Sequence, residues 1–263
     1  MNKSNCLRFI TDRQTHLNKD LSLKISKIDP SQLNILEIPN NTFRLAPSNI
    51  VDMRNKMRPI VDQGNLGSCT ANALCCLVNY IDPKMNGSRL FLYYNERSIQ
   101  GTINFDAGAY LHDGVASLIK NGICSEKSWP YIISKYKTKP PNTCYTEASD
   151  HQVLTAKNIN NDLQSMKNAL QSGFPFVVGI LVYQSFMSAT VAKTGKVPMP
   201  GPRDRLLGGH AIACVGYDDN KKVFIMKNSW GTSWGAKGYF YLPYAYLTSK
   251  SLTSDLWCLL TIE

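Results

Sequence analysis

The sequence lacks any long hydrophobic run. Its longest strongly apolar stretch is FPFVVGILVY, residues 174–183, whereas a helix that spans a bilayer needs roughly 20 such residues. The N-terminal stretch MNKSNCLRFITDRQTHLNKD contains no apolar core of the kind found in a secretory signal. We therefore expect no membrane partner and no export signal, and we place the protein in the cytoplasm or packaged within a particle.

Histidine is scarce and the cysteines are scattered. The 263 residues include four histidines and eight cysteines, and no two cysteines form a C-x-x-C pair. Because the histidines do not cluster with cysteines at zinc-site spacing, we predict no structural metal and no cofactor. A long chain without an export signal favours free thiols over disulfides, although a Cys124–Cys144 bridge stays open.

A dense basic run is also missing, although the formal net charge is +10. The lysines and arginines are spread from Lys3 to Lys250, and no nucleic-acid-binding module is visible. A basic balance attracts anions nonspecifically. We expect a solvated basic surface and no specific nucleic-acid partner.

The composition divides the chain into an arm and a domain. Residues 1–45 are polar, mixed in charge and rich in Asn, Ser and Pro, which predicts an extended or partly ordered arm. Residues 46–263 are predicted to form one compact domain, without internal repeats. This length is sufficient for two lobes with a cleft between them.

Helical and strand signals separate along the domain. Apolar periodicity predicts helices over 69–82, 89–99, 108–121 and 162–172. Ser68 is the candidate N-cap of the first helix, Gly122 ends the third, and Asn161 or Asp162 caps the fourth. Short β-branched and aromatic runs then predict strands over 174–182, 210–219, 222–230 and 238–244, with a hairpin turn at YDDNKK. Helices followed by strands indicate an α+β fold with two facing lobes.

Three cysteines lie close together in DQGNLGSCTANALCCLVNY, residues 62–80. Cys69 begins the first predicted helix, where the helix dipole and unpaired N–H groups favour a thiolate. Cys75 and Cys76 lie inside the same helix, where nothing assists ionisation, so we predict that they pack in the core. Cys69 is therefore the candidate nucleophile.

A cysteine nucleophile needs a base and a group that orients the base. His210 follows two glycines and opens the predicted strand AIACVGY. Asn228 lies in KNSWGTSWG, next to Trp230 and Trp234. An Asn oxygen can accept the imidazole N–H, and an indole can exclude water from that bond. His112 lies beside Asp113 on a predicted helix, and we expect it at the surface or the edge of the core.

The motifs QGNLGSC, GGHA and NSWGTSWGAKGYF together resemble those of the papain-like cysteine peptidases. His210 stands 141 residues after Cys69 and Asn228 stands 159 after it, against roughly 130–150 in the family, so a loop insertion is expected. The resemblance covers roughly residues 52–263. It implies a two-lobed fold with a helical left lobe, a β-barrel-like right lobe and an active-site cleft between them. The form LGSCTAN is similar to members from bacteria and large DNA viruses.

The resemblance also implies a role for each matching residue. It makes Cys69 the nucleophile, His210 its base and Asn228 the orienting group, while Gln63 and the Cys69 N–H form an oxyanion hole. It implies a protein or peptide substrate, bound as an extended strand. The substrate-binding positions that it suggests are Gly108, Ala109, Ala211, Trp230, Ser254 and Asp255.

Ser254 and Asp255 match the floor of the family's main specificity pocket. If Asp255 points inward, a basic side chain is favoured two residues before the cut; if Ser254 does, an apolar one is favoured. The sequence leaves both alternatives open.

The chain also departs from the familiar pattern. Leu66 stands where secreted members have a cysteine of a disulfide, so stability is expected to come from the core, as in a reducing compartment. Residues 1–45 are shorter than the usual prosegment and lack its helical motif, but we expect them to act as an inhibitory prosegment. Cys6 either forms a reversible disulfide with Cys69 or is an incidental thiol.

Other function classes stay in view. A binding or scaffolding protein can keep this fold without turnover, a transferase can use the same triad for acyl transfer, and a basic protein can bind nucleic acid. The presence of all four functional positions favours an enzyme over a scaffold. The Gln63 spacing and the NSWG motif favour the peptidase over the transferase.

Overall fold

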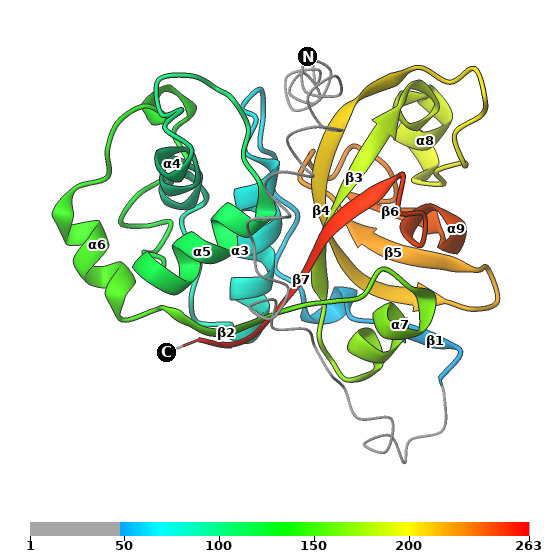
Figure 1. The fold of residues 1–263 in the computed structure, drawn as a ribbon, viewed down its shortest axis with the longest axis horizontal. Helices are drawn as coiled ribbons and strands as arrows, with labels where there is room; N and C mark the ends of the chain where they lie inside the picture. The colour runs from blue at the N-terminus through cyan, green and yellow to red at the C-terminus, as the bar shows by residue number, and fades with distance from the viewer. Residues whose placement is uncertain (1–47, 263) are drawn as a thin grey trace.

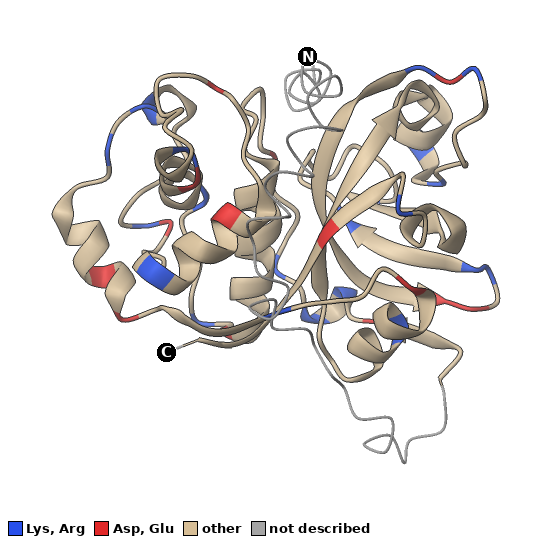
Figure 2. Ribbon diagram, viewed as in Figure 1, with Lys and Arg blue, Asp and Glu red and all other residues tan. Residues whose placement is uncertain are grey.

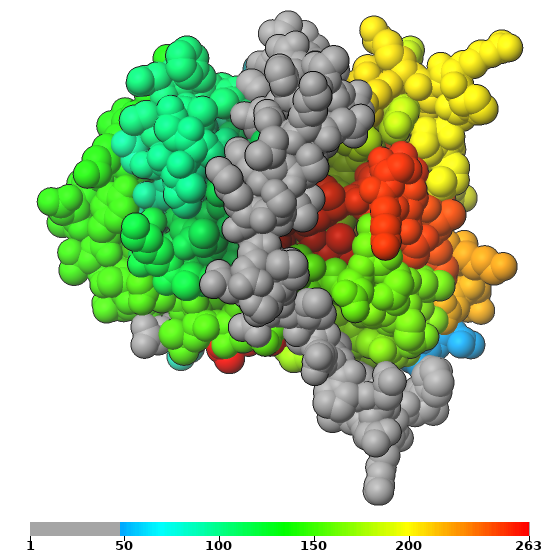
Figure 3. All heavy atoms as spheres, viewed as in Figure 1, coloured from blue at the N-terminus to red at the C-terminus, as the bar shows by residue number. Residues whose placement is uncertain are grey.

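The computed structural model describes residues 48–262, which form a helical lobe and a sheet lobe (Figure 1). In the space-filling view of Figure 3, the helical lobe lies on the left and the sheet lobe on the right. The predicted arm, residues 1–45, lies outside the described residues, as does Cys6. The predictions that concern them stay predictions.

The helical lobe is built around one buried helix. Its main helices are α3 (Cys69–Ile81), α4 (Arg89–Ile99), α5 (Leu111–Asn121) and α6 (Asn142–Ser149). In α3, every residue from Cys69 to Val78 is buried, as the nearly uniform apolar sequence predicts. The predicted helices over 69–82 and 89–99 are confirmed to within one residue.

The third predicted helix begins three residues later than expected. Gly108 has φ +68° and Tyr110 is extended, so α5 starts only at Leu111. A glycine with positive φ interrupts the helical path although the apolar spacing continues through it. Gly122 ends α5 as predicted, with φ +71°.

The sheet lobe contains strands that pair antiparallel in the order β2-β7-β3-β4-β5-β6, with β1 against β4. Their bounds are β1 (Ile50–Asp52), β2 (Val153–Asn158), β3 (Phe176–Tyr183), β4 (Leu206–Asp218), β5 (Val223–Lys227), β6 (Tyr239–Pro243) and β7 (Thr253–Ile262). In the described chain this path is open, with β2 and β6 at its ends, so the barrel-like lobe is an open twisted sheet. The hairpin turn between β4 and β5 falls on YDDNKK as predicted.

Short helices and turns complete the two lobes. The helices are α7 (Leu163–Gln171), α8 (Ala189–Thr194) and α9 (Tyr244–Leu247), and the 3-10 turns are η3 (Arg54–Lys56), η4 (Ile133–Lys135) and η5 (Gln184–Met187). Helix α7 matches the predicted helix over 162–172. Its N-cap is Asp162, whose side chain accepts from the Ser165 N–H.

The lobes share one core. α3 packs against β4, and a continuous cluster of buried side chains runs from the helices into the sheet. β7 and β2 reach from the sheet to the base of the helical lobe (Figure 1). Lysine and arginine positions are distributed over both lobes (Figure 2), which agrees with their scatter in the sequence.

Glu96 on α4 is a fully buried carboxyl beneath the start of α3. Its Oε2 accepts from Thr70 Oγ1 at 2.7 Å, and its Oε1 has no hydrogen-bond partner among the described residues. Burial is the main cause that raises the pKa of Glu96 well above its ordinary value; the Thr70 hydrogen bond opposes this shift, and nearby Cys69 adds to it. A protonated Glu96 places no negative charge beside Cys69.

We expect Glu96→Gln to become more stable than wild type as the pH rises. The folded state holds the Glu96 proton above the pKa of about 4.3 at which an unfolded glutamate releases it, so wild-type stability falls with rising pH. Glutamine has no proton to lose and keeps an oxygen for Thr70. Thermal unfolding should show nearly equal Tm values at pH 4 and a gain of several degrees for the variant at pH 8.

Glu147→Gln serves as a control of opposite sign. Burial acts to raise the pKa of Glu147, but hydrogen bonds from Ser128 and Ser125 outweigh it and lower this pKa. The Tm of Glu147→Gln should therefore fall further below that of wild type as the pH rises. A pH-independent Tm difference for Glu96→Gln would contradict the assignment of a raised pKa.

Gly122→Ala should destabilise the fold strongly. A Cβ at this position would lie 1.8 Å from the Ala148 carbonyl oxygen, on a backbone with positive φ. The clash and the strain together should cost about 2–4 kcal/mol, which a Tm drop of about 5–10 °C would report. Gly201→Ala is the matched control, because no atom lies within 4 Å of its added Cβ, and its Tm should stay close to that of wild type.

Candidate active site

Cys69 is the first residue of α3 and is 8% exposed. Ser68 occupies the N-cap position as predicted, but its side chain makes no capping hydrogen bond. Its Oγ instead contacts Tyr131 Oη at 2.5 Å and accepts from Asn72 Nδ2 at 3.0 Å. The predicted side-chain cap is therefore wrong, because these partners hold the Ser68 hydroxyl away from the first turn.

His210 and Asn228 are brought together from neighbouring strands. His210 lies on β4, Asn228 directly follows β5, and the distance from His210 Nε2 to Asn228 Oδ1 is 2.8 Å. Both side chains are 3% exposed. Asn228 Oδ1 also accepts from the Ser229 N–H at 2.9 Å.

An aromatic cluster covers the imidazole. The ring of Trp230 stacks on His210 with 4.6 Å between centroids, and Trp234 packs edge-on against Trp230 at 5.0 Å. Phe186 contacts both indoles. Trp230 is only 2% exposed, so it shields the imidazole from water.

Gln63 is fixed next to the Asn228 segment. Its Oε1 accepts from Ser229 Oγ at 2.6 Å, and its backbone N–H donates to the Ser229 carbonyl at 2.8 Å. Its Nε2 donates to the Leu66 carbonyl at 2.9 Å. Ser229 was not among the predicted site residues, because the sequence does not reveal which group a single hydroxyl will bind.

Asp106 connects two predicted site segments. Its Oδ1 accepts from the Gly67 N–H at 3.0 Å and from Tyr93 Oη at 2.5 Å, and Tyr93 Oη accepts from the Gly108 N–H at 3.1 Å. Burial is the main cause that raises the pKa of Asp106. The network fixes Gly108 relative to the residues just before Cys69. In the sequence, only the stretch DAGAY pointed to this part of the site.

Two candidate substrate-binding positions, Ala211 and Ser254, lie on either side of one residue of β3. Gly179 on β3 pairs with Ala211 on one side and with Ser254 on the other. Directly paired residues of antiparallel strands share a face, so Ala211 and Ser254 flank a position without a side chain. Ser254 is exposed, and in the helical lobe Gly108 is buried and Ala109 half-buried.

Asp255 is turned away from its neighbour Ser254. Its Oδ2 accepts from the backbone N–H of His112 at 3.2 Å, and its Oδ1 accepts from Trp257 Nε1 at 2.6 Å. The two pocket candidates that the sequence left open therefore differ. The Asp255 carboxylate is hydrogen-bonded within the protein, whereas Ser254 is exposed.

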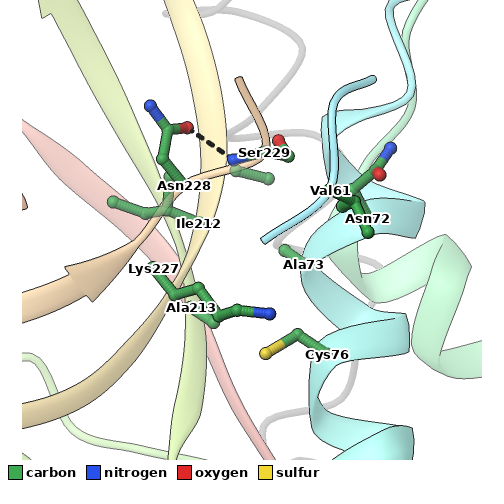
Figure 4. Close-up of a pocket in the computed structure, with 10 residues that line it drawn as sticks. Val61, Asn72, Ala73, Cys76, Ile212, Ala213, Lys227, Asn228 and Ser229 are labelled. Atoms are coloured by element: carbon green, nitrogen blue, oxygen red, sulfur yellow. Dashed lines mark hydrogen bonds between the residues drawn. The ribbon is translucent and has the colours of Figure 1, made fainter. Parts of the chain in front are cut away.

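A small cavity lies below the site, between α3 and the strands β4 and β5 (Figure 4). Its volume of about 10 Å³ is sufficient for one water molecule. The buried Lys227 points toward Cys76 in this cavity and donates to the Pro59 carbonyl at 3.3 Å. Burial raises the pKa of Cys76, opposed by Lys227, and raises that of Cys75 further, so both behave as packing residues.

The thiols of Cys124 and Cys144 are neighbours but form no disulfide. The bridge left open by the sequence is therefore not formed. Between residues 48 and 262, no group of three or more His, Cys, Asp or Glu residues could hold a metal ion, and no helix has the length and apolarity to cross a membrane.

Comparisons with known proteins agree with this geometry. The sequence profile described as "Papain family cysteine protease" matches residues 47–252. A protein of Acanthamoeba polyphaga mimivirus, named as an uncharacterized peptidase C1-like protein, is 43% identical over 211 residues, which are 75% of this chain and 68% of that protein. Cysteine proteinase 1 of Entamoeba histolytica is 28% identical over 236 residues, 84% of this chain and 70% of that one.

Solved structures give the same result. The crystal structure of xylellain, a cysteine protease from Xylella fastidiosa, superimposes with a TM-score of 0.82 at 35% identity and covers 88% of this chain and 92% of that one. The profile match spans most of the chain, and two relatives with substantial identity are named as peptidases or proteases. The chain thus belongs to the papain family of cysteine proteases and is a cysteine peptidase that acts on proteins.

Proposed function

We propose that Cys69, His210, Asn228 and Gln63 carry out peptide-bond hydrolysis through an acyl-enzyme. The Cys69 thiolate attacks the scissile carbonyl carbon, and the His210 imidazolium protonates the leaving amine. Water, deprotonated by His210, then attacks the thioester and releases the acid and the Cys69 sulfur. The observation that carries this proposal is the 2.8 Å hydrogen bond between His210 Nε2 and Asn228 Oδ1.

The hydrogen bonds of Asn228 determine which imidazole nitrogen serves the sulfur. Since Asn228 Oδ1 accepts the Ser229 N–H, the atom that faces His210 is the oxygen rather than the amide nitrogen. His210 must therefore donate from Nε2–H, which leaves Nδ1 to exchange a proton with Cys69. The stacked Trp230 keeps water from competing for the Nε2–H bond.

Gln63 supports an oxyanion hole. Ser229 holds its Oε1, so the amide NH₂ is directed to the other side, where one hydrogen is donated to Leu66. The second hydrogen and the Cys69 N–H are then the donors for a developing oxyanion. Donors that are already oriented stabilise the transition state more than the substrate.

The cleft suits an extended peptide between Gly108–Ala109 and the row Ser254–Gly179–Ala211. Strand addition needs backbone groups and close approach, which glycines on both walls permit. Because the carboxylate of Asp255 is engaged by His112 and Trp257, Ser254 is the better candidate for the pocket floor. We therefore propose a preference for an apolar rather than a basic side chain two residues before the cut.

Two further proposals rest on the sequence alone. Residues 1–45 are proposed to act as an inhibitory prosegment, as the family resemblance implies. The second proposal is that the protein acts in the cytoplasm or within a particle, where the free thiols expected from the sequence stay reduced.

Cys69→Ala should abolish cleavage of a dipeptidyl fluorogenic amide, with a loss of about 10⁴-fold or more and an unchanged Tm. It should also abolish labelling by an epoxide thiol inhibitor. Cys75→Ala is the control, since that thiol is buried in the core, and it should keep both labelling and activity. If Cys69→Ala still cleaved the amide, the proposed mechanism would be wrong.

Gln63→Ala should lower kcat by about 10²–10³-fold with little change in KM, because an oxyanion donor acts mainly in the transition state. Ser229→Ala removes only the group that orients Gln63, so its loss should be smaller. Steady-state kinetics of both variants measure this, and Tm values check folding. A Gln63→Ala variant within threefold of wild-type kcat is incompatible with the assigned oxyanion hole.

A further inference from the structure

Asp255 has a backbone conformation that is unusual for a strand residue. Its φ is +60°, although it lies inside β7. From the pair Val177–Trp257 to the pair Gly179–Ser254, β3 advances two residues while β7 advances three, which is a β-bulge. Bulges redirect side chains and concentrate near active sites, and a non-glycine residue at positive φ persists only where the surroundings compensate its strain.

The bulge directs the Asp255 carboxylate at the start of α5. His112 is the second residue of α5, and its backbone N–H donates to Asp255 Oδ2 at 3.2 Å, with its Nδ1 3.3 Å from the same oxygen. Trp257, which follows the bulge, donates to Oδ1 and fixes the carboxylate from its other side. The Asp255 side chain is 23% exposed, so these contacts are partly shielded from water.

α5 has no N-terminal cap from its own sequence. Tyr110 occupies the N-cap position, and its side chain makes no capping hydrogen bond. A carboxylate that accepts an N–H of the first turn does the work of an N-cap residue and interacts favourably with the helix dipole. Asp255 therefore caps α5 from the opposite lobe.

The cap joins the two walls of the cleft. α5 begins at Leu111, two residues after Ala109, and Asp255 directly follows Ser254. Both are positions that we propose to contact the substrate. A shift between α5 and β7 at this point would change the separation of the walls directly.

We propose that Asp255 is a positioning residue that sets the width of the substrate cleft by capping α5 across the lobes. The proposal rests on the proposed function, because it concerns the same cleft. Since the Asp255 carboxylate is bonded to the His112 and Trp257 N–H groups, its loss should act on substrate binding. KM should rise while kcat stays nearly constant.

Asp255→Gly is the informative variant. Glycine accepts the positive φ without strain, so this change removes the carboxylate and leaves the bulge in place. In the full-length protein, KM for an internally quenched peptide of at least four residues should rise about three- to tenfold, in line with the loss of a helix cap, with kcat within twofold. Asp255→Asn, which keeps one acceptor oxygen, should give a smaller rise.

Lys222→Gly is the matched control, because it also replaces a non-glycine residue of positive φ by glycine and so relieves the same kind of backbone strain. Lys222 has φ +54° in the β4–β5 turn, away from the cleft. This variant should leave KM unchanged, so a rise in KM only for Asp255→Gly identifies the lost carboxylate as the cause.

Amide hydrogen exchange tests the cap without depending on the proposed peptidase mechanism. The His112 amide should exchange faster in Asp255→Gly than in wild type and in Lys222→Gly, whether or not the protein cleaves the peptide. Unchanged exchange together with unchanged KM would overturn the cap while leaving the peptidase mechanism intact. A loss of activity confined to substrates with a basic side chain two residues before the cut would overturn it too, because Asp255 would then contact substrate.

Discussion

The hydrogen bonds of Ser229 hold the proposed site together. Its hydroxyl donates to Gln63 Oε1 and its N–H donates to Asn228 Oδ1, so one residue orients both the proposed oxyanion donor and the group that holds His210. The carbonyl of Ser229 accepts the Gln63 N–H as well. Two parts of the site that lie far apart in the sequence are thereby fixed to one another before any substrate binds, which is what electrostatic preorganisation requires.

The cleft walls are joined at more than one place. Near the reacting groups, the Asp62–Trp230 bridge and the bond from Gly231 N–H to the Val61 carbonyl connect the segment before α3 to the segment after β5. At the rim of the cleft, Asp255 connects β7 to α5. In the proposed function, the first contact aligns the reacting groups, and the second aligns backbone proposed to bind substrate.

The sequence predicted those features that depend on local chemistry. The uniform apolar character of 69–81, the glycine at 122 and the β-branched runs of β3 to β6 each produce the expected element. It did not predict β7, because Ser254 and Asp255 interrupt the apolar alternation where the bulge lies. It also placed the start of α5 too early, since the apolar spacing gives no sign that Gly108 adopts a positive φ.

The side-chain partners within the site depend on contacts between distant residues, which the sequence could not predict. The hydroxyl of Ser68 is a good local cap, yet Tyr131 and Asn72 take it in the fold. Asp106, Glu96 and Ser229 are ordinary residues in the sequence, and they gain their roles only from Tyr93, Thr70 and Gln63, which other segments supply. Motifs therefore identified the candidate reacting groups, whereas the groups that position them required the structure.

Burial and helix position together bear on how a chain with many thiols can use one of them as a nucleophile. Six described cysteines other than Cys69 are buried, and in each of them burial is the main cause that raises the thiol pKa: Cys75, Cys76, Cys124, Cys144, Cys214 and Cys258. Even Cys76, with Lys227 beside it, has a net raised pKa. A thiol that stays protonated is a poor nucleophile. Cys69 is itself only 8% exposed, so desolvation alone does not distinguish it from these cysteines. It is the one described cysteine that begins a helix, where the dipole favours an anion.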